Sequence, residues 1–246
     1  MKKKKFLSTV IWVCLFAIAM GYLESAVVVY IRALYYPEGF NFPMKLISDQ
    51  ILETEFFREA ATMVMLVGIA VIAGKKPVER FAYFILSFGV WDIFYYVFLY
   101  LLLGWPQSLF TWDILFFIPV TWVGPVLAPL INSAMMILLA FTLMYFFVRN
   151  KKTKTGPLVW SLLISGSLVV IVSYTMDFVC FMLPEFSIWE VMGAGDTQKM
   201  LSYATTYIPR HFNWWLFFCG TMLHVFSICL IIRKNRRAFI KNMVSE

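Results

Sequence analysis

The chain has 246 residues, of which 61% are hydrophobic and only 14% charged, whereas soluble domains carry about 25% charged residues. An ordinary soluble domain is therefore excluded. The net charge of +7 does not indicate nucleic acid, because the basic residues are confined to short clusters between apolar runs. These runs are long and lack the alternation of a membrane β-strand, which disfavours an outer-membrane barrel. The composition predicts an all-α helical bundle forming a single integral membrane domain.

Six transmembrane helices are predicted, because each bilayer span needs about 20 mainly apolar residues. Four basic clusters hold 16 of the 21 Lys and Arg residues, and two spans separate each cluster from the next. All four clusters therefore lie on one side, which the positive-inside rule makes cytoplasmic together with both termini. We expect a plasma-membrane or bacterial inner-membrane protein. The predicted spans are approximately 6–34, 57–74, 81–104, 124–148, 157–183 and 212–232.

The first span has an alternative interpretation. The cluster Lys2–Lys5, an apolar stretch and Ala17-Ile18-Ala19 also fit a cleavable signal peptide. Apolar residues resume after Glu24 and continue to Ile31, which is too long for a signal sequence and favours an uncleaved span.

The first outer loop also contains apolar residues near helical spacing, from Leu46 to Leu52. This spacing predicts a helix lying on the membrane surface and leading into the second span.

The segment 113–148 cannot be one straight span. As a single helix its 36 residues would measure about 54 Å, against roughly 30 Å of hydrocarbon. Pro119, Pro125 and Pro129 interrupt it, since proline removes a backbone donor and clashes with the preceding turn. We predict a broken half-helix or a shallow re-entrant piece over 113–118, an irregular link over 120–124, and span four from about Val126. Broken helices often line binding sites in transporters, although a kinked entry without a ligand is an equally simple interpretation.

Several ionisable residues fall inside the predicted spans at a similar depth. Glu24, Glu59 and Asp177 lie towards the outer edge, Asp92 lies near the midplane, and His211 begins the sixth span from outside. A carboxylate at the bilayer centre costs about 2.5–3.5 kcal/mol, so Asp92 should face the bundle interior. Tyr95 and Tyr96 follow it at i+3 and i+4 and are expected to donate hydrogen bonds to it.

The second span carries a polar stripe formed by Glu55, Arg58, Glu59 and Thr62, which recur at helical spacing. Arg58 could pair with Glu24, and Arg210 with Asp177.

The six residues that begin with Trp91-Asp92 resemble the six that begin with Trp112-Asp113, on either side of the second hairpin. The two aspartates could flank one cavity, but the match ends after six residues, and chance similarity is the simpler interpretation.

Three functions compatible with these residues remain open. The favoured one is a pocket open to the non-cytoplasmic side that binds or transports a small polar or cationic solute. The second is an intramembrane enzyme acting on a lipid or lipid-linked substrate at the outer leaflet. The third is a non-catalytic subunit, whose polar core fixes helix packing. The candidate ligand-binding residues are Glu24, Arg58, Glu59, Asp92, Tyr95, Tyr96, Asp113, Asp177 and His211.

No catalytic residue or cofactor is identified by a motif. A divalent metal would require His211 with Glu24, Glu59 and Asp92, since no spacing places two ligands on one helix face. Haem is disfavoured, because about 20 Å of helix separates His211 from His224. The expected partners are the lipid bilayer and a small solute or lipid-linked substrate, with no nucleic acid, and the oligomeric state stays open.

Overall fold

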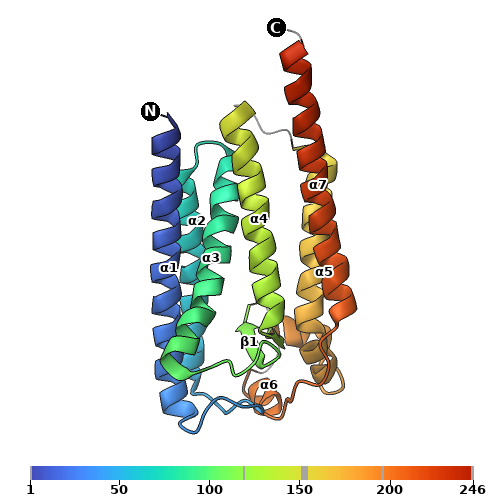
Figure 1. Ribbon diagram of the computed structural model, residues 1–246. Helices are drawn as coiled ribbons and strands as arrows, with labels where there is room; N and C mark the ends of the chain where they lie inside the picture. Colours follow the sequence, from blue (N-terminus) through green and yellow to red (C-terminus); the bar gives the residue numbers. More distant parts are fainter. Residues whose placement is uncertain (1, 119, 151–154, 195–196, 245–246) are drawn as a thin grey trace.

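The computed structural model describes residues 2–118, 120–150, 155–194 and 197–244. Its six long helices run side by side as a bundle (Figure 1), and each is long and apolar enough to cross a membrane. The prediction of an all-α multi-pass bundle is confirmed. The helices are α1 (Lys2–Tyr35), α2 (Asp49–Ala73), α3 (Pro77–Leu103), α4 (Leu127–Asn150), α5 (Pro157–Met182) and α7 (Trp214–Val244).

Helix α2 begins earlier than the sequence suggested. It starts at Asp49, after the extended residue Ser48, so Ile51 and Leu52 belong to its first turns. The helix expected on the membrane surface is therefore the outer end of α2 itself.

The start of α1 and the end of α7 lie at the same end of the bundle, as do the connection from α2 to α3, the end of α4 and the start of α5 (Figure 1). Lys75 and Lys76 precede α3 at this end, and the ammonium of Lys76 lies 5.8 Å from the ring of Phe147 near the end of α4. Arg149 and Arg233 lie in the last turns of α4 and in the terminal part of α7. The described residues of the basic clusters therefore lie at one end of the bundle, as expected.

Strands form where the half-helix was predicted. Strand β1 (Trp112–Phe116) pairs antiparallel with β2 (Trp122–Pro125), and Asp113 lies opposite Gly124. The half-helix prediction for 113–118 is wrong, because the aromatic and β-branched residues around Pro119 pair across a hairpin that satisfies their backbone groups at this depth. Span four is a helix from Leu127, close to the expected start.

The bundle consists of two lobes. The first contains α1, α2, α3 and α4, the second contains α5 and α7, and the interface between α4 and α7 joins them. Small residues bring the helices close together. A Cβ added at Gly89 of α3 would lie 2.7 Å from the carbonyl oxygen of Ser133 on α4. Side chains larger than glycine do not fit at this point.

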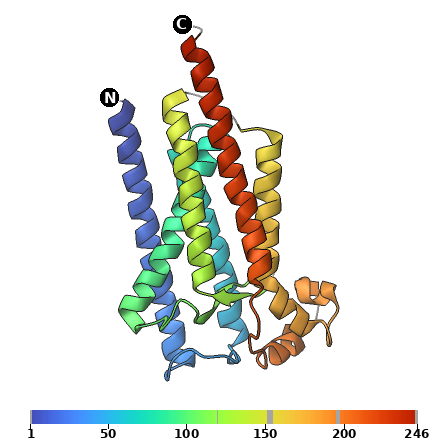
Figure 2. The ribbon, with the colours of Figure 1, turned by 45° about the vertical axis from the view of Figure 1, so that its right-hand side comes forward.

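The end opposite the termini carries the remaining elements. The π-helical turn η1 (Glu190–Ala194) and helix α6 (Thr197–Ala204) lie there, beside the first outer loop (Figure 2). Asp177 of α5 holds the segment after α6, because its carboxylate accepts hydrogen bonds from the Tyr207 hydroxyl at 2.6 Å and from the Arg210 backbone N–H at 3.2 Å. The predicted Asp177–Arg210 contact is thus made by the Arg210 backbone.

Candidate functional site

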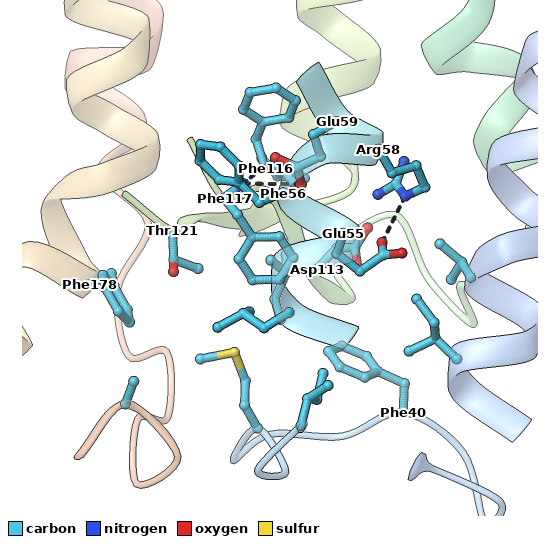
Figure 3. Close-up of a pocket in the computed structure, with 18 of the residues that line it drawn as sticks. Phe40, Glu55, Phe56, Arg58, Glu59, Asp113, Phe116, Phe117, Thr121 and Phe178 are labelled. Carbon is cyan, nitrogen blue, oxygen red and sulfur yellow. Dashed lines mark hydrogen bonds and ion pairs between the residues drawn. The ribbon is translucent and has the colours of Figure 1, made fainter. Parts of the chain in front are cut away.

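A cavity of about 400 Å³ lies between the lobes, near the end of the bundle opposite the termini. It takes its walls from α1, α2, α3, the β-hairpin, α5, α6 and the first outer loop. Figure 3 shows that Glu55, Arg58, Glu59 and Asp113 come together from α2 and the hairpin, with Phe178 of α5 on the opposite side. Segments distant in sequence therefore meet at one pocket.

Arg58 of α2 bridges two carboxylates. Its guanidinium forms an ion pair with Glu24 of α1 and another with Glu55, whose Oε2 lies 2.7 Å from the arginine Nε. The hydroxyl of Thr62 donates to the second oxygen of Glu24 at 3.4 Å. The Arg58–Glu24 pair considered from the sequence is present, and the polar stripe of α2 faces the pocket.

Glu59 fastens the hairpin to α2. Its two carboxylate oxygens accept the backbone N–H of Phe117, at 3.0 Å and 3.2 Å, and its side chain is buried. Among the described residues no Lys or Arg forms an ion pair with it. Its hydrogen bonds therefore come from a neutral donor, and Arg58 acts on it only at longer range.

Asp92 of α3 accepts a hydrogen bond from the Ser133 hydroxyl of α4 at 2.7 Å. The prediction that Tyr95 and Tyr96 donate to Asp92 is wrong for Tyr96, whose hydroxyl donates instead to Asp113 at 3.0 Å. The long phenol extends past the carboxylate one turn away and meets the hairpin, whose position the sequence did not show. Tyr95 lines the pocket and packs edge-to-face on Tyr96.

Asp113 of β1 is the buried acid of the hairpin. The guanidinium of Arg32 lies 3.5 Å from its Oδ1 and stacks 3.8 Å from the ring centroid of Trp105. Burial raises the pKa of Asp113 from about 3.8 to about 6, although Arg32 and the Tyr96 hydroxyl oppose this shift. Asp113 therefore keeps its proton to a higher pH than an exposed aspartate does.

The ionisable side chains of the lining carry an excess of negative charge. Five are carboxylates and three are cations, among the residues of the lining that the structure describes. Two of the cations are the arginines already paired, and the third, Lys45, lies 5.4 Å from the ring of Tyr36 in the first outer loop. Within the described chain Glu59 and Asp92 form no ion pair, although Arg58 attracts Glu59 at longer range.

Seven of the nine candidate residues predicted from the sequence line this one cavity. They are Glu24, Arg58, Glu59, Asp92, Tyr95, Tyr96 and Asp113.

Asp177 and His211 are not among the lining residues, and His211 is exposed. The candidate metal set of His211 with Glu24, Glu59 and Asp92 is not brought together. Within the described chain, no group of three or more His, Cys, Asp or Glu side chains could hold a metal ion. His224 lies elsewhere, between α5 and α7, where its Nε2 is 3.3 Å from both the Ser167 hydroxyl and the Leu163 carbonyl oxygen.

Two partners in the pocket were not singled out from the sequence. Ser133 was one serine among many, and Phe117 acts through its backbone N–H, which no sequence pattern marks. The repeat of Trp91-Asp92 as Trp112-Asp113 pointed to the pocket itself, since both aspartates line the same cavity. It did not point to Ser133 or Phe117.

The fold and the cavity define a multi-pass membrane protein with an acidic, aromatic-walled pocket at one end of its bundle. Comparisons of the chain with protein-family models, with curated proteins and with solved structures found no match.

Proposed function

We propose that the pocket binds a small organic cation and that the protein carries this solute or senses it from the non-cytoplasmic side. The observation behind the proposal is the pair Glu59 and Asp92, which line the cavity and accept hydrogen bonds only from neutral donors among the described contacts. Carboxylates in this position are costly in a membrane. A bound cation would offset that cost.

The aromatic walls favour an organic cation over a bare metal ion. Trp91, Tyr95, Tyr96, Phe116 and Phe117 all line the cavity, and aromatic faces attract ammonium groups by about 0.5–2 kcal/mol. A hard metal ion would require several oxygen ligands around one point. Carboxylates spread over the walls suit a larger, softer cation better.

The distribution of basic residues supports access from the outer side. The pocket lies at the end away from both termini and from the basic clusters next to α3, α4 and α7, and such clusters mark the cytoplasmic face. The position of the cavity between two lobes also supports transport, because movement of one lobe against the other would change its access.

Binding of radiolabelled benzyltrimethylammonium to the protein in lipid nanodiscs tests this proposal. Glu59→Gln and Asp92→Asn should each weaken binding about tenfold, a loss of about 1.4 kcal/mol. Glu185→Gln is the matched control, because Glu185 is exposed and is not a lining residue. Benzenesulfonate, an anion with the same ring, should not compete.

Two results would contradict cation binding. One is wild-type affinity in both Glu59→Gln and Asp92→Asn. The other is the absence of saturable binding to the wild type, together with a loss of thermal stability in both variants. That second result would assign the carboxylates to helix packing and favour a non-catalytic subunit.

A further inference from the structure

The walls of the pocket differ in chemistry from one end to the other. The ionisable and phenolic groups belong mainly to α1, α2, α3 and β1, whereas the residues of the two outer loops and α6 are mostly apolar. Leu46 is exposed, and the other apolar residues of this set are buried or half-buried. They are Met44, Ile47, Val191, Met200, Leu201 and Ala204.

This apolar cap covers the side of the pocket nearest the aqueous phase. Met44 and Ile47 come from the first outer loop, and Met200 and Leu201 from α6, at the end of the bundle away from the termini (Figure 2). A compact hydrophilic cation entering from water would have to lose its hydration while passing these side chains. An amphiphile would meet no such barrier.

The cavity is also elongated along α2. Its lining residues on this helix run from Leu52 to Thr62, a distance of about 15 Å at 1.5 Å per residue. A charged headgroup at Glu59 would occupy only part of this length. The remainder suits an apolar chain or ring system.

Phe56 connects the pocket with the outer surface of the bundle. It is a lining residue, and yet its side chain is 46% exposed on a membrane-spanning helix. Helix α2 packs against α1 and α3, and α5 packs against α7 and β2, but within the described chain α2 and α5 share no closely packed interface. Both helices nevertheless border the cavity, with Phe178 and Met182 on α5.

We infer that the ligand is a cationic amphiphile, an amine with a long apolar chain, which enters from the bilayer between α2 and α5. This inference rests on the proposed function, because it assigns the chemical class of the same cation. The headgroup would lie against Glu59 and Asp92, and the chain would extend past Phe56 towards lipid.

A chain-length series tests the inference. Tetramethylammonium, octyltrimethylammonium and dodecyltrimethylammonium are used to displace labelled benzyltrimethylammonium from the wild type in nanodiscs, at concentrations that leave the discs intact. Dodecyltrimethylammonium should displace the probe at a concentration at least about tenfold lower than tetramethylammonium, as expected when an apolar chain is buried with the headgroup. Dodecyl sulfate, which enters the bilayer with the wrong charge, should not displace it.

Two neighbouring phenylalanines provide a matched pair of variants. Phe56→Trp enlarges a lining side chain and should reduce the advantage of dodecyltrimethylammonium over tetramethylammonium more than Phe57→Trp does. Phe57→Trp is the control, because Phe57 is 61% exposed and is not a lining residue. If Phe56→Trp does not fold, the chain-length series on the wild type still tests whether the ligand is an amphiphile.

The outcomes separate the two proposals. If all three ammonium ions displace the probe equally well, the amphiphile is excluded and cation binding stands. If dodecyl sulfate competes as well as dodecyltrimethylammonium, the chain acts through the bilayer and the inference fails. If the probe does not bind the wild type, the proposed function fails, and the inference fails with it.

Discussion

Tyr96 of α3 donates its phenol hydrogen to Asp113 of strand β1 over 3.0 Å, so the hairpin is attached to the third span inside the pocket. Tyr96→Phe removes this bond and leaves the rest of the ring in place. We expect a loss of about 1.5–3 kcal/mol in the free energy of unfolding, as for a hydrogen bond to a charged group.

A double-mutant cycle with Asp113→Asn, followed by chemical denaturation in detergent, checks this prediction. If the effects of the two substitutions simply add, then Tyr96 and Asp113 do not stabilise each other.

Arg58 is predicted to be essential for stability. Arg58→Ala leaves Glu24 and Glu55 without their shared cation, and breaking a buried pair from one side costs about 3–5 kcal/mol. Adding Glu24→Gln to this variant should restore part of the loss, because one uncompensated carboxylate is removed. Thermal unfolding measures both effects, with Arg210→Gln as control, since Arg210 contacts Asp177 through its backbone. A melting temperature unchanged in Arg58→Ala would refute the prediction.

The packing between α3 and α4 should be sensitive to one methyl group. At Gly89 an added Cβ would lie 2.7 Å from the Ser133 carbonyl oxygen, whereas at Gly68 of α2 it would meet nothing within 4 Å. Gly89→Ala should therefore destabilise the protein by about 1–3 kcal/mol, as overpacking does. Gly68→Ala should be neutral or slightly stabilising. Thermal unfolding of the two alanine variants gives the comparison, and equal melting temperatures would show that α3 and α4 can separate without cost.

Asp113 should make stability depend on pH. Its pKa is about 6 in the folded protein and about 3.9 in an unfolded chain. Because the folded state binds the proton more tightly, the contribution is fully present below about pH 4 and is lost as the pH rises through 6. The shift corresponds to about 2–3 kcal/mol.

The free energy of unfolding, measured between pH 4 and 7 for wild type and Asp113→Asn, isolates this group from the other acids. The difference between the two proteins should change across this range. A constant difference would show that Asp113 keeps an ordinary pKa in spite of its burial.

The orientation of the bundle can be tested with single cysteines in a background without Cys14, Cys180, Cys219 and Cys229. A cysteine replacing Lys75 should react with a membrane-impermeant maleimide only after the cells are permeabilised. A cysteine replacing Glu185, on the opposite end, should react in intact cells. The reverse pattern would place the pocket on the cytoplasmic side.

Hydropathy and charge were sufficient to predict the bundle and its six spans, because long apolar runs and short basic clusters are local features of the chain. The position of the hairpin could not be predicted in this way. Pro119, Pro125 and Pro129 showed that no straight helix was formed, but whether the interrupted segment becomes a half-helix or two strands depends on contacts with α2 and α3.

The depth of each carboxylate was also predictable, since it follows from counting along a helix. The partner of each carboxylate was not predictable. The exception was Arg58, which has the opposite charge to Glu24 and lies at the same level. Ser133 and the backbone of Phe117 are ordinary in sequence and become partners only through the packing of α4 and the course of the hairpin. His211 shared the expected level but lies away from the pocket, because depth does not determine the direction in which a residue faces.

The close approach of Gly89 to α4 has a mechanical consequence. It holds α3 and α4 together within one lobe, so any rocking of this lobe against α5 and α7 would pivot at the interface between α4 and α7. The pocket has walls in both lobes and a hairpin tethered to each, through Glu59 of α2 and through the packing of β2 on α5. A small rotation at the pivot would therefore strain the hairpin first. Because the hairpin is attached to both lobes, it would limit how far they can separate.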